Sequence, residues 1–135
     1  MRLAELNPVF IRYETRVETW DVIDGDHETW RERGCPTKPF TGPRQYMPFA
    51  DGLADAQGIR FLCPACFAKN GGARGTHAID VTFAGRDARD DQGSHNRKGE
   101  PSRWIVSGAS FDDLTLSPSI DVGCWHGYIT NGDAR

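Results

Sequence analysis

The clearest pattern along the chain is an alternation of apolar and polar side chains near its N-terminus. Between residues 9 and 19 most even positions are charged, and the odd positions are apolar or β-branched: Val9, Ile11, Tyr13, Thr15, Val17 and Thr19. Successive side chains of a strand point to opposite faces, so this pattern predicts a half-buried strand. The phase breaks after Trp20 and a turn is expected at Asp24-Gly25-Asp26, from which a hairpin could return through residues 27–33.

The following segment, residues 34–58, is rich in residues that interrupt regular structure. Its prolines and glycines are Gly34, Pro36, Pro39, Gly42, Pro43, Pro48, Gly52 and Gly58. Proline lacks a backbone N–H and disrupts both helix interiors and central strands, so we expect a long loop here. Its aromatic and aliphatic side chains would anchor that loop to the core.

Two further features follow in the middle of the chain. Residues 77–83 alternate again, with His77, Ile79, Val81 and Phe83 in one phase, and predict a second clear strand. Residues 84–102 contain almost nothing apolar to bury, so we expect a mobile surface loop.

The C-terminal third predicts three more short strands. Strand-forming residues recur at 104–106, at 114–120 and at 127–130. Pro118 lies inside the second of these, so that strand should be kinked or lie at an edge. Asn131-Gly132 is the most favourable hairpin dipeptide and predicts a turn after the third.

Composition limits the size and class of the fold. The chain has 135 residues, which is the size of one domain with one modest core, and its 15 glycines and 8 prolines indicate many turns. We therefore predict a single, mainly β domain, a small antiparallel sheet with long loops. Residues 1–58 would form an N-terminal strand and the proline-rich loop, and residues 59–133 the core.

The residues that carry chemistry are a cysteine pair and a cysteine–histidine pair. Cys63-Pro64-Ala65-Cys66 follows an apolar run and precedes glycines, as in a zinc knuckle, where a tight turn presents two thiolates to one ion. A tetrahedral zinc ion needs two more ligands, and Cys124 and His126 are the only other compact pair. Residues i and i+2 of a strand share a face, so we predict Zn²⁺ bound by Cys63, Cys66, Cys124 and His126 in a zinc-ribbon-like staple.

Alternative ligands and alternative chemistry remain open at this point. His77 begins a strand close to the knuckle and competes with His126, and Cys35 is a spare thiol in the loop. A redox Cys-x-x-Cys normally begins a helix in a βαβ unit, whereas here we expect strand on both sides. The serines beside Pro118 have no nucleophile-elbow motif around them and indicate turn residues.

Several short motifs together carry a resemblance to a known family. They occur in the order Cys63-Pro64-x-Cys66, His77-Ala78-Ile79, Trp104-x-Val106, Leu116-Ser117-Pro118-Ser119-Ile120, and Cys124-x-His126-x-Tyr128-Ile129-x-Asn131-Gly132. This pattern resembles a family of small uncharacterised phage and prophage proteins that is often mislabelled as ammonia monooxygenase. The resemblance covers about residues 59–133. It implies a phage origin and a metal site, but no reaction.

Two function classes follow from these observations. The first is a non-enzymatic protein with a structural zinc site that binds a host or phage protein, since four protein ligands leave no open position on the ion. The second is a zinc-dependent hydrolase or nuclease, with His77 or His95 and Asp80 near the metal. Nucleic acid is not favoured as a partner, because the net charge is −3 and acidic residues offset the arginines of residues 86–103. With no apolar run long enough for a membrane or signal segment, we expect a cytoplasmic protein, in the host cytoplasm if phage-encoded.

Overall fold

The computed structural model describes the backbone of residues 1–135 and every side chain except those of His27 and Thr29. The chain divides into two compact units, one made of residues 1–13 and 47–135, which we call the body, and one made of residues 14–46, which we call the ribbon. The organisation of the chain as a single domain, with residues 1–58 and 59–133 as its two parts, stays a prediction. The first strand of the chain belongs to the body, since it pairs there with later residues.

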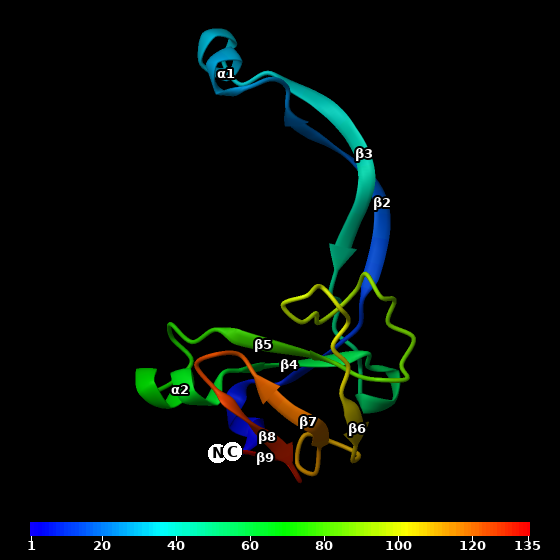
Figure 1. The fold of residues 1–135 in the computed structure, drawn as a ribbon, viewed down its shortest axis with the longest axis vertical. Helices are drawn as coiled ribbons and strands as arrows, with labels where there is room; N and C mark the ends of the chain where they lie inside the picture. The colour runs from blue at the N-terminus through cyan, green and yellow to red at the C-terminus, as the bar shows by residue number, and fades with distance from the viewer. The chain divides into compact units, whose positions relative to one another are not determined.

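The body is built from small antiparallel sheets, as predicted (Figure 1). One sheet has the order β1-β4-β5 and the other the order β6-β7-β8-β9. The strands are β1 (Val9–Ile11), β4 (Gly58–Leu62), β5 (Ala78–Thr82), β6 (Ile105–Ser107), β7 (Thr115–Asp121), β8 (His126–Thr130) and β9 (Asp133–Ala134). Two single turns of 3-10 helix, η1 (Leu3–Leu6) and η2 (Leu53–Asp55), and the helix α2 (Pro64–Asn70) complete the body.

One hydrophobic cluster is shared by both sheets of the body. Ile59 and Phe61 of β4 are fully buried and lie in the same cluster as Leu116 of β7 and Ile129 of β8. The strand predicted over residues 77–83 is confirmed as β5, and Ile79, Val81 and Phe83 of its predicted inner phase are buried. The alternation is incomplete, because His77 of the same phase is exposed and Thr82 of the other phase is fully buried. Period-two patterning thus places one face of each sheet against the core.

The ribbon contains two long strands and a short helix. β2 (Glu14–Ile23) pairs with β3 (Thr37–Tyr46) over ten residues, and α1 (His27–Arg33) connects them. The single strand predicted over residues 9–19 is therefore two strands, β1 and β2, and only the first is buried. Val17, on the face expected to be covered, is 76% exposed, because a two-stranded ribbon has no second layer of its own.

Two further expectations are corrected by the ribbon, and one is decided between its alternatives by the C-terminal sheet. The proline-rich segment contains a long strand, β3, and residues 27–33 form a helix rather than a returning strand. β3 tolerates Pro39 and Pro43 because it has only one neighbouring strand, so a missing N–H on its outer side breaks no ladder bond. The sequence predicts Pro118 in a strand that is kinked or at an edge. It lies in β7, which is flanked by β6 and β8 and whose register against β8 shifts between Leu116 and Ile120, so the first alternative holds.

The loop of residues 84–102 is held by specific hydrogen bonds. The Arg103 guanidinium donates to the backbone carbonyls of Arg89 at 3.0 Å, Gln92 at 2.8 Å and Ser94 at 2.9 Å. The Ser94 N–H in turn donates to the buried Thr82 hydroxyl at 2.8 Å. The segment is irregular, as expected. Its backbone carbonyls converge on the Arg103 side chain, an interaction that the pattern of apolar residues could not predict.

Both ends of the chain meet at the β8–β9 hairpin. The Leu3 N–H donates to the Gly132 carbonyl at 2.8 Å, and the Ala134 N–H donates to the Met1 carbonyl at 2.8 Å. The Asn131-Gly132 turn forms as predicted, and β9 pairs with β8 over two residues. No described helix has both the length and the apolar content that crossing a membrane requires.

Candidate metal centre

Three thiols and one imidazole of the body converge on one point. The ligand atoms of Cys63, Cys66, His77 and Cys124 all lie within 4.8 Å of one another. The Cys124 Sγ lies 3.6 Å from the Sγ of Cys63, 3.6 Å from that of Cys66 and 3.1 Å from the His77 Nε2. These four residues could therefore hold one metal ion.

The spacing of the sulfur atoms suits a tetrahedral ion. Two thiolates bound to one zinc ion at about 2.3 Å each lie about 3.8 Å apart when the ion is tetrahedral. The observed sulfur separations of 3.6 Å are close to that value. A donor set of three thiolates and one imidazole is also a common composition of structural zinc sites, so the cluster is compatible with zinc.

The first two thiols are placed by the start of α2. Cys63 directly follows β4 and is the N-cap of the helix, Pro64 is its first residue, and Cys66 lies in its first turn. Proline is favoured at this position because its missing N–H has no helical partner there. The helix ends at Gly71, whose positive φ of 69° is the left-handed conformation typical of a helix C-cap.

This helix corrects the expectation that strand flanks the cysteine pair, and with it one argument against a redox motif. Other observations still separate this site from a thioredoxin-like one. β4 and β5 are antiparallel, so α2 does not connect parallel strands of a βαβ unit. A third thiol and an imidazole also lie within reach of the pair, which is the arrangement of a metal centre.

His77 reaches the cluster because of the β4–β5 register. Leu62 pairs with Ala78, and one step further the Cys63 N–H donates to the His77 carbonyl at 2.9 Å. The His77 Nδ1 lies 3.4 Å from the Ala78 carbonyl, while Nε2 faces the thiols. An Nδ1–H that donates to a backbone carbonyl leaves the Nε2 lone pair available to a metal ion.

Cys124 is presented by a tight loop between β7 and β8. The Gly123 N–H donates to the Asp121 carboxylate at 3.0 Å, and the Val122 N–H donates to the Trp125 carbonyl at 2.9 Å. Gly123 has a φ of +85°, which favours glycine at this position. Trp125 is buried and its ring meets the Phe61 ring edge-on with centroids 6.3 Å apart, which anchors the loop to the core.

His126 does not belong to the group, in contrast to its predicted role as the fourth ligand. Its Nε2 lies 3.0 Å from the Ser119 hydroxyl and its Nδ1 lies 4.0 Å from the Asp121 carboxylate. The prediction assumed that Cys124 and His126 share a strand face. Cys124 instead lies in the loop before β8, so the i, i+2 rule does not apply, and His126 begins β8 on its exposed side.

The other residues considered in the sequence are elsewhere. Cys35 is an exposed free thiol of the ribbon and is not part of the four-residue group. His95 lies in the loop of residues 84–102, where its Nδ1 and Nε2 contact the carbonyls of Gly93 and Asp90. Asp80 forms an ion pair with Arg60 at 2.7 Å. Within the described residues, no carboxylate joins the three thiols and the imidazole.

The packing of three thiols changes the acidity of one of them. The hydrogen bond with Cys124, followed by desolvation and by Cys63, raises the pKa of the Cys66 thiol to about 11. Adjacent thiolates repel one another, so the second and third lose their protons reluctantly unless a cation is present. The cluster is therefore a strong candidate for a cation site, and metal binding there would release protons.

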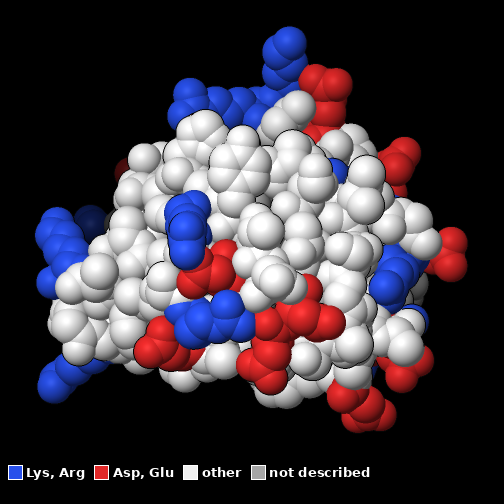
Figure 2. Space-filling view, turned by 90° about the horizontal axis from the view of Figure 1, so that it is seen from below, with Lys and Arg blue, Asp and Glu red and all other residues white. Residues whose placement is uncertain are grey.

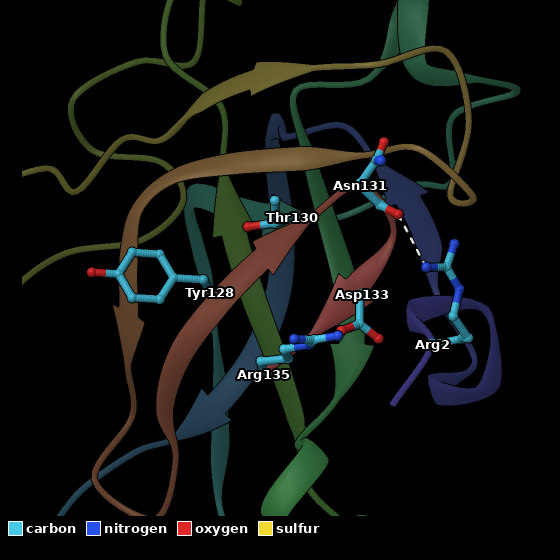
Figure 3. A pocket seen from close by; sticks show the side chains of 6 residues that line it. All are labelled: Arg2, Tyr128, Thr130, Asn131, Asp133 and Arg135. Atoms are coloured by element: carbon cyan, nitrogen blue, oxygen red, sulfur yellow. Dashed lines mark hydrogen bonds and ion pairs between the residues drawn. The ribbon is translucent and has the colours of Figure 1, made fainter.

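Apart from the four-residue cluster, a hollow of about 770 Å³ lies on the β8–β9 hairpin (Figure 3). Its charged groups are already engaged with the chain itself. The Arg2 guanidinium donates to the carbonyls of Asn131 at 3.1 Å and Asp112 at 2.6 Å, and Arg135 pairs with Asp133. These contacts join the N-terminal residues to the hairpin. The charged residues that line the hollow therefore have a structural role, and none is needed to bind a ligand.

Comparisons with known proteins give no family, relative or structural neighbour. No protein-family model matches the chain, no curated protein matches it in sequence, and no solved structure matches its fold. The function must therefore be inferred from the site itself.

Proposed function

We propose that this chain is a small zinc-binding protein in which one structural Zn²⁺ fastens α2, the start of β5 and the β7–β8 loop together. The observation that carries the proposal is the convergence of Cys63, Cys66, His77 and Cys124 within 4.8 Å. These residues come from three separate segments of the body. An ion bound by all four would hold those segments as a cross-link.

The free energy available from such an ion is large for a domain of this size. Structural zinc contributes about 10–16 kcal/mol of apparent binding free energy in zinc-finger peptides. A typical domain is stable by only about 5–15 kcal/mol. Zinc would therefore supply a major part of the stability of the body.

We infer further that the protein acts by binding a macromolecule rather than by catalysis. Four protein ligands complete a tetrahedral shell, which leaves no position for the water that a zinc hydrolase activates. The alternative of a zinc-dependent hydrolase or nuclease would require a ligand to leave. A protein of host or phage origin remains the proposed partner, in keeping with the family resemblance of the sequence.

Nucleic acid is a less suitable partner on the evidence of charge. The net charge is −3, and Figure 2 shows basic and acidic side chains interspersed on the face in view rather than gathered into one basic patch. Contact with phosphates depends on concentrated positive charge. Neighbouring groups of opposite sign cancel most of that attraction.

The test of the proposal is metal content combined with stability and activity. We expect one zinc per chain by mass spectrometry of the native protein, and a cobalt-substituted form with the absorption bands of tetrahedral thiolate coordination. Chelation should lower the melting temperature, and re-addition of zinc should restore it. A protein that binds no zinc, or one that melts unchanged after chelation, contradicts the structural role. Zinc-dependent hydrolysis by the fully loaded protein would favour the enzyme instead.

A further inference from the structure

The two outer edges of the ribbon differ in their capacity to pair with another strand. In an antiparallel pair, directly opposed residues alternate between pairs that exchange hydrogen bonds and pairs whose N–H and C=O groups point outward. The Asp24 N–H donates to the Pro36 carbonyl at 2.9 Å. The even-numbered residues of β2, which alternate in phase with Asp24, therefore form the hydrogen-bonded pairs with β3. The odd-numbered residues of β2 form the pairs whose N–H and C=O groups point outward, and these pairs include Val17 with Pro43, Thr19 with Thr41, and Asp21 with Pro39.

It follows that the outer edge of β3 is blocked and the outer edge of β2 is open. Pro39 and Pro43 stand where β3 would present an outward N–H, and proline has none. The opposite residues of β2, Asp21 and Val17, are not prolines and direct their backbone groups away from β3. Prolines on one edge are a known protection against unwanted strand pairing, so their absence from the other edge marks it as available.

The β2 edge also carries exposed apolar surface. Val17 is 76% exposed and Ile23 is 56% exposed, and the odd-numbered positions of β2 place them on the same face. An isolated two-stranded ribbon is only marginally stable in water, whereas added strands extend the ladder and cover side chains. The ribbon would therefore gain from a further strand along β2.

The charges of β2 match those of a second copy of β2. We propose that β2 pairs antiparallel with β2 of a second copy of this chain, about a twofold axis through Val17. In this register Val17 faces Val17 of the second copy, and Arg16 faces Glu18 of the second copy twice, once on each side of the axis. Opposite charges directly across two strands are favourable.

The neighbouring symmetric register is disfavoured by the same criterion. An axis through Thr19 would place Glu14 opposite Asp24 of the second copy on both sides, and like charges directly across a pair are destabilising. It would also move Val17 of one copy away from Val17 of the second copy. An axis through Thr15 would also oppose Glu14 and Arg16, but because β2 begins at Glu14 it would pair only residues 14–16 of β2. The axis at Val17 opposes unlike charges over a longer stretch of the strand, so we favour it over both neighbouring registers.

A matched pair of proline substitutions tests the open edge. Thr19 and Thr41 are opposed residues, both exposed, and their hydroxyls lie 2.7 Å apart, so each substitution removes the same side-chain contact. Thr19→Pro removes an outward N–H from β2, and Thr41→Pro removes one from β3. By sedimentation of the zinc-loaded full chain, we expect a dimer for the native protein and for Thr41→Pro, and a monomer for Thr19→Pro. A monomeric native chain, or two variants with the same oligomeric state, overturns the proposal.

Cysteine trapping tests the register without relying on proline. In a Cys35→Ser background, Val17→Cys should form an intermolecular disulfide under mild oxidation, because directly bonded partners lie about 5.5 Å apart, within the range of a disulfide. Thr19→Cys should not cross-link, since the two introduced thiols would be several residues out of register. Cross-linking of Thr19→Cys and not of Val17→Cys would overturn the Val17 axis, as would failure of both.

Discussion

The Nε2 of His77 lies 3.1 Å from the Sγ of Cys124, although the two residues are 47 positions apart in the sequence. The β4–β5 register positions the imidazole and the β7–β8 loop positions the thiol. The candidate metal centre thus depends on both sheets of the body. Substitution of its ligands therefore tests whether the two sheets meet at this site.

Substitution of the two histidines should separate their roles. We expect His77→Ala to weaken zinc binding at least tenfold and to lower the melting temperature, because it removes one of four ligands. His126→Ala should change zinc affinity little, since its ring contacts Ser119 and Asp121 instead. Competition titration with a chromogenic chelator measures both affinities, and the reverse ranking would restore His126 as the ligand.

The contrast between these histidines shows what the sequence could and could not predict. Alternation places Ile59 and Phe61 in phase on β4, and Ile79 and Val81 in phase on β5. Once those residues are opposed, Cys63 must lie opposite His77, so that ligand could have been found from the hairpin register. The i, i+2 argument for His126 failed because nothing in the local pattern shows that Cys124 precedes the strand.

Other elements were hidden because local signals conflicted with tertiary context. β3 contains Pro39 and Pro43, which argue against a central strand but are harmless on the outer side of a two-stranded ribbon. α2 is too short for a helical period to show, and its start coincides with the cysteine pair. The mainly β class was predictable because most core positions lie on alternating strands.

Arg103 should control the order of the loop of residues 84–102. We expect Arg103→Ala to destabilise the body by about 1–3 kcal/mol, since a charged donor to several backbone carbonyls is lost. Hydrogen exchange of the amides between residues 89 and 102 should accelerate. Arg97→Ala, an exposed arginine of the same loop, is the control and should leave both measurements unchanged.

Gly127 should not tolerate a methyl group. A Cβ there would lie 2.1 Å from the Arg135 carbonyl oxygen and 2.6 Å from a Trp125 ring atom. Gly127→Ala should therefore cost about 1–3 kcal/mol through overpacking, measured by urea unfolding. Gly52→Ala is the matched control, because nothing lies within 4 Å of its Cβ position and its φ of −167° is ordinary extended backbone. Equal stabilities would show that the end of the chain shifts freely.

Asp113 should contribute to stability in a pH-dependent manner. Hydrogen bonds from the N–H groups of Ser110 and Ala109 lower the pKa of its carboxyl below 3.8. A lowered pKa in the folded state stabilises the protein above the unfolded value, and the effect disappears as pH falls through the folded value. The difference in melting temperature between the native protein and Asp113→Asn should be largest near neutral pH and should shrink below about pH 4. A difference that is constant with pH would contradict this account.

Metal removal should loosen the body and leave the ribbon intact. All four candidate ligands belong to the body, whereas residues 14–46 form a separate compact unit stabilised by β2–β3 pairing. Chelation should therefore accelerate hydrogen exchange first at residues 63–77 and 121–126, where the ligands are carried. The amides that bond β2 to β3 should exchange at nearly the same rate with and without zinc.

Trp125 provides an optical measure of the same event. Its buried ring packs edge-on against Phe61, and its backbone follows Cys124 directly, so release of Cys124 should expose the indole and shift its fluorescence to longer wavelength. Trp125→Phe removes that signal while keeping an aromatic ring, and it identifies the contribution of Trp125 among the four tryptophans. Zinc removal that leaves the spectrum unchanged would show that the ion does not fasten the β7–β8 loop to the core. Release of the ribbon amides together with those of the body would contradict a separate response of the two units.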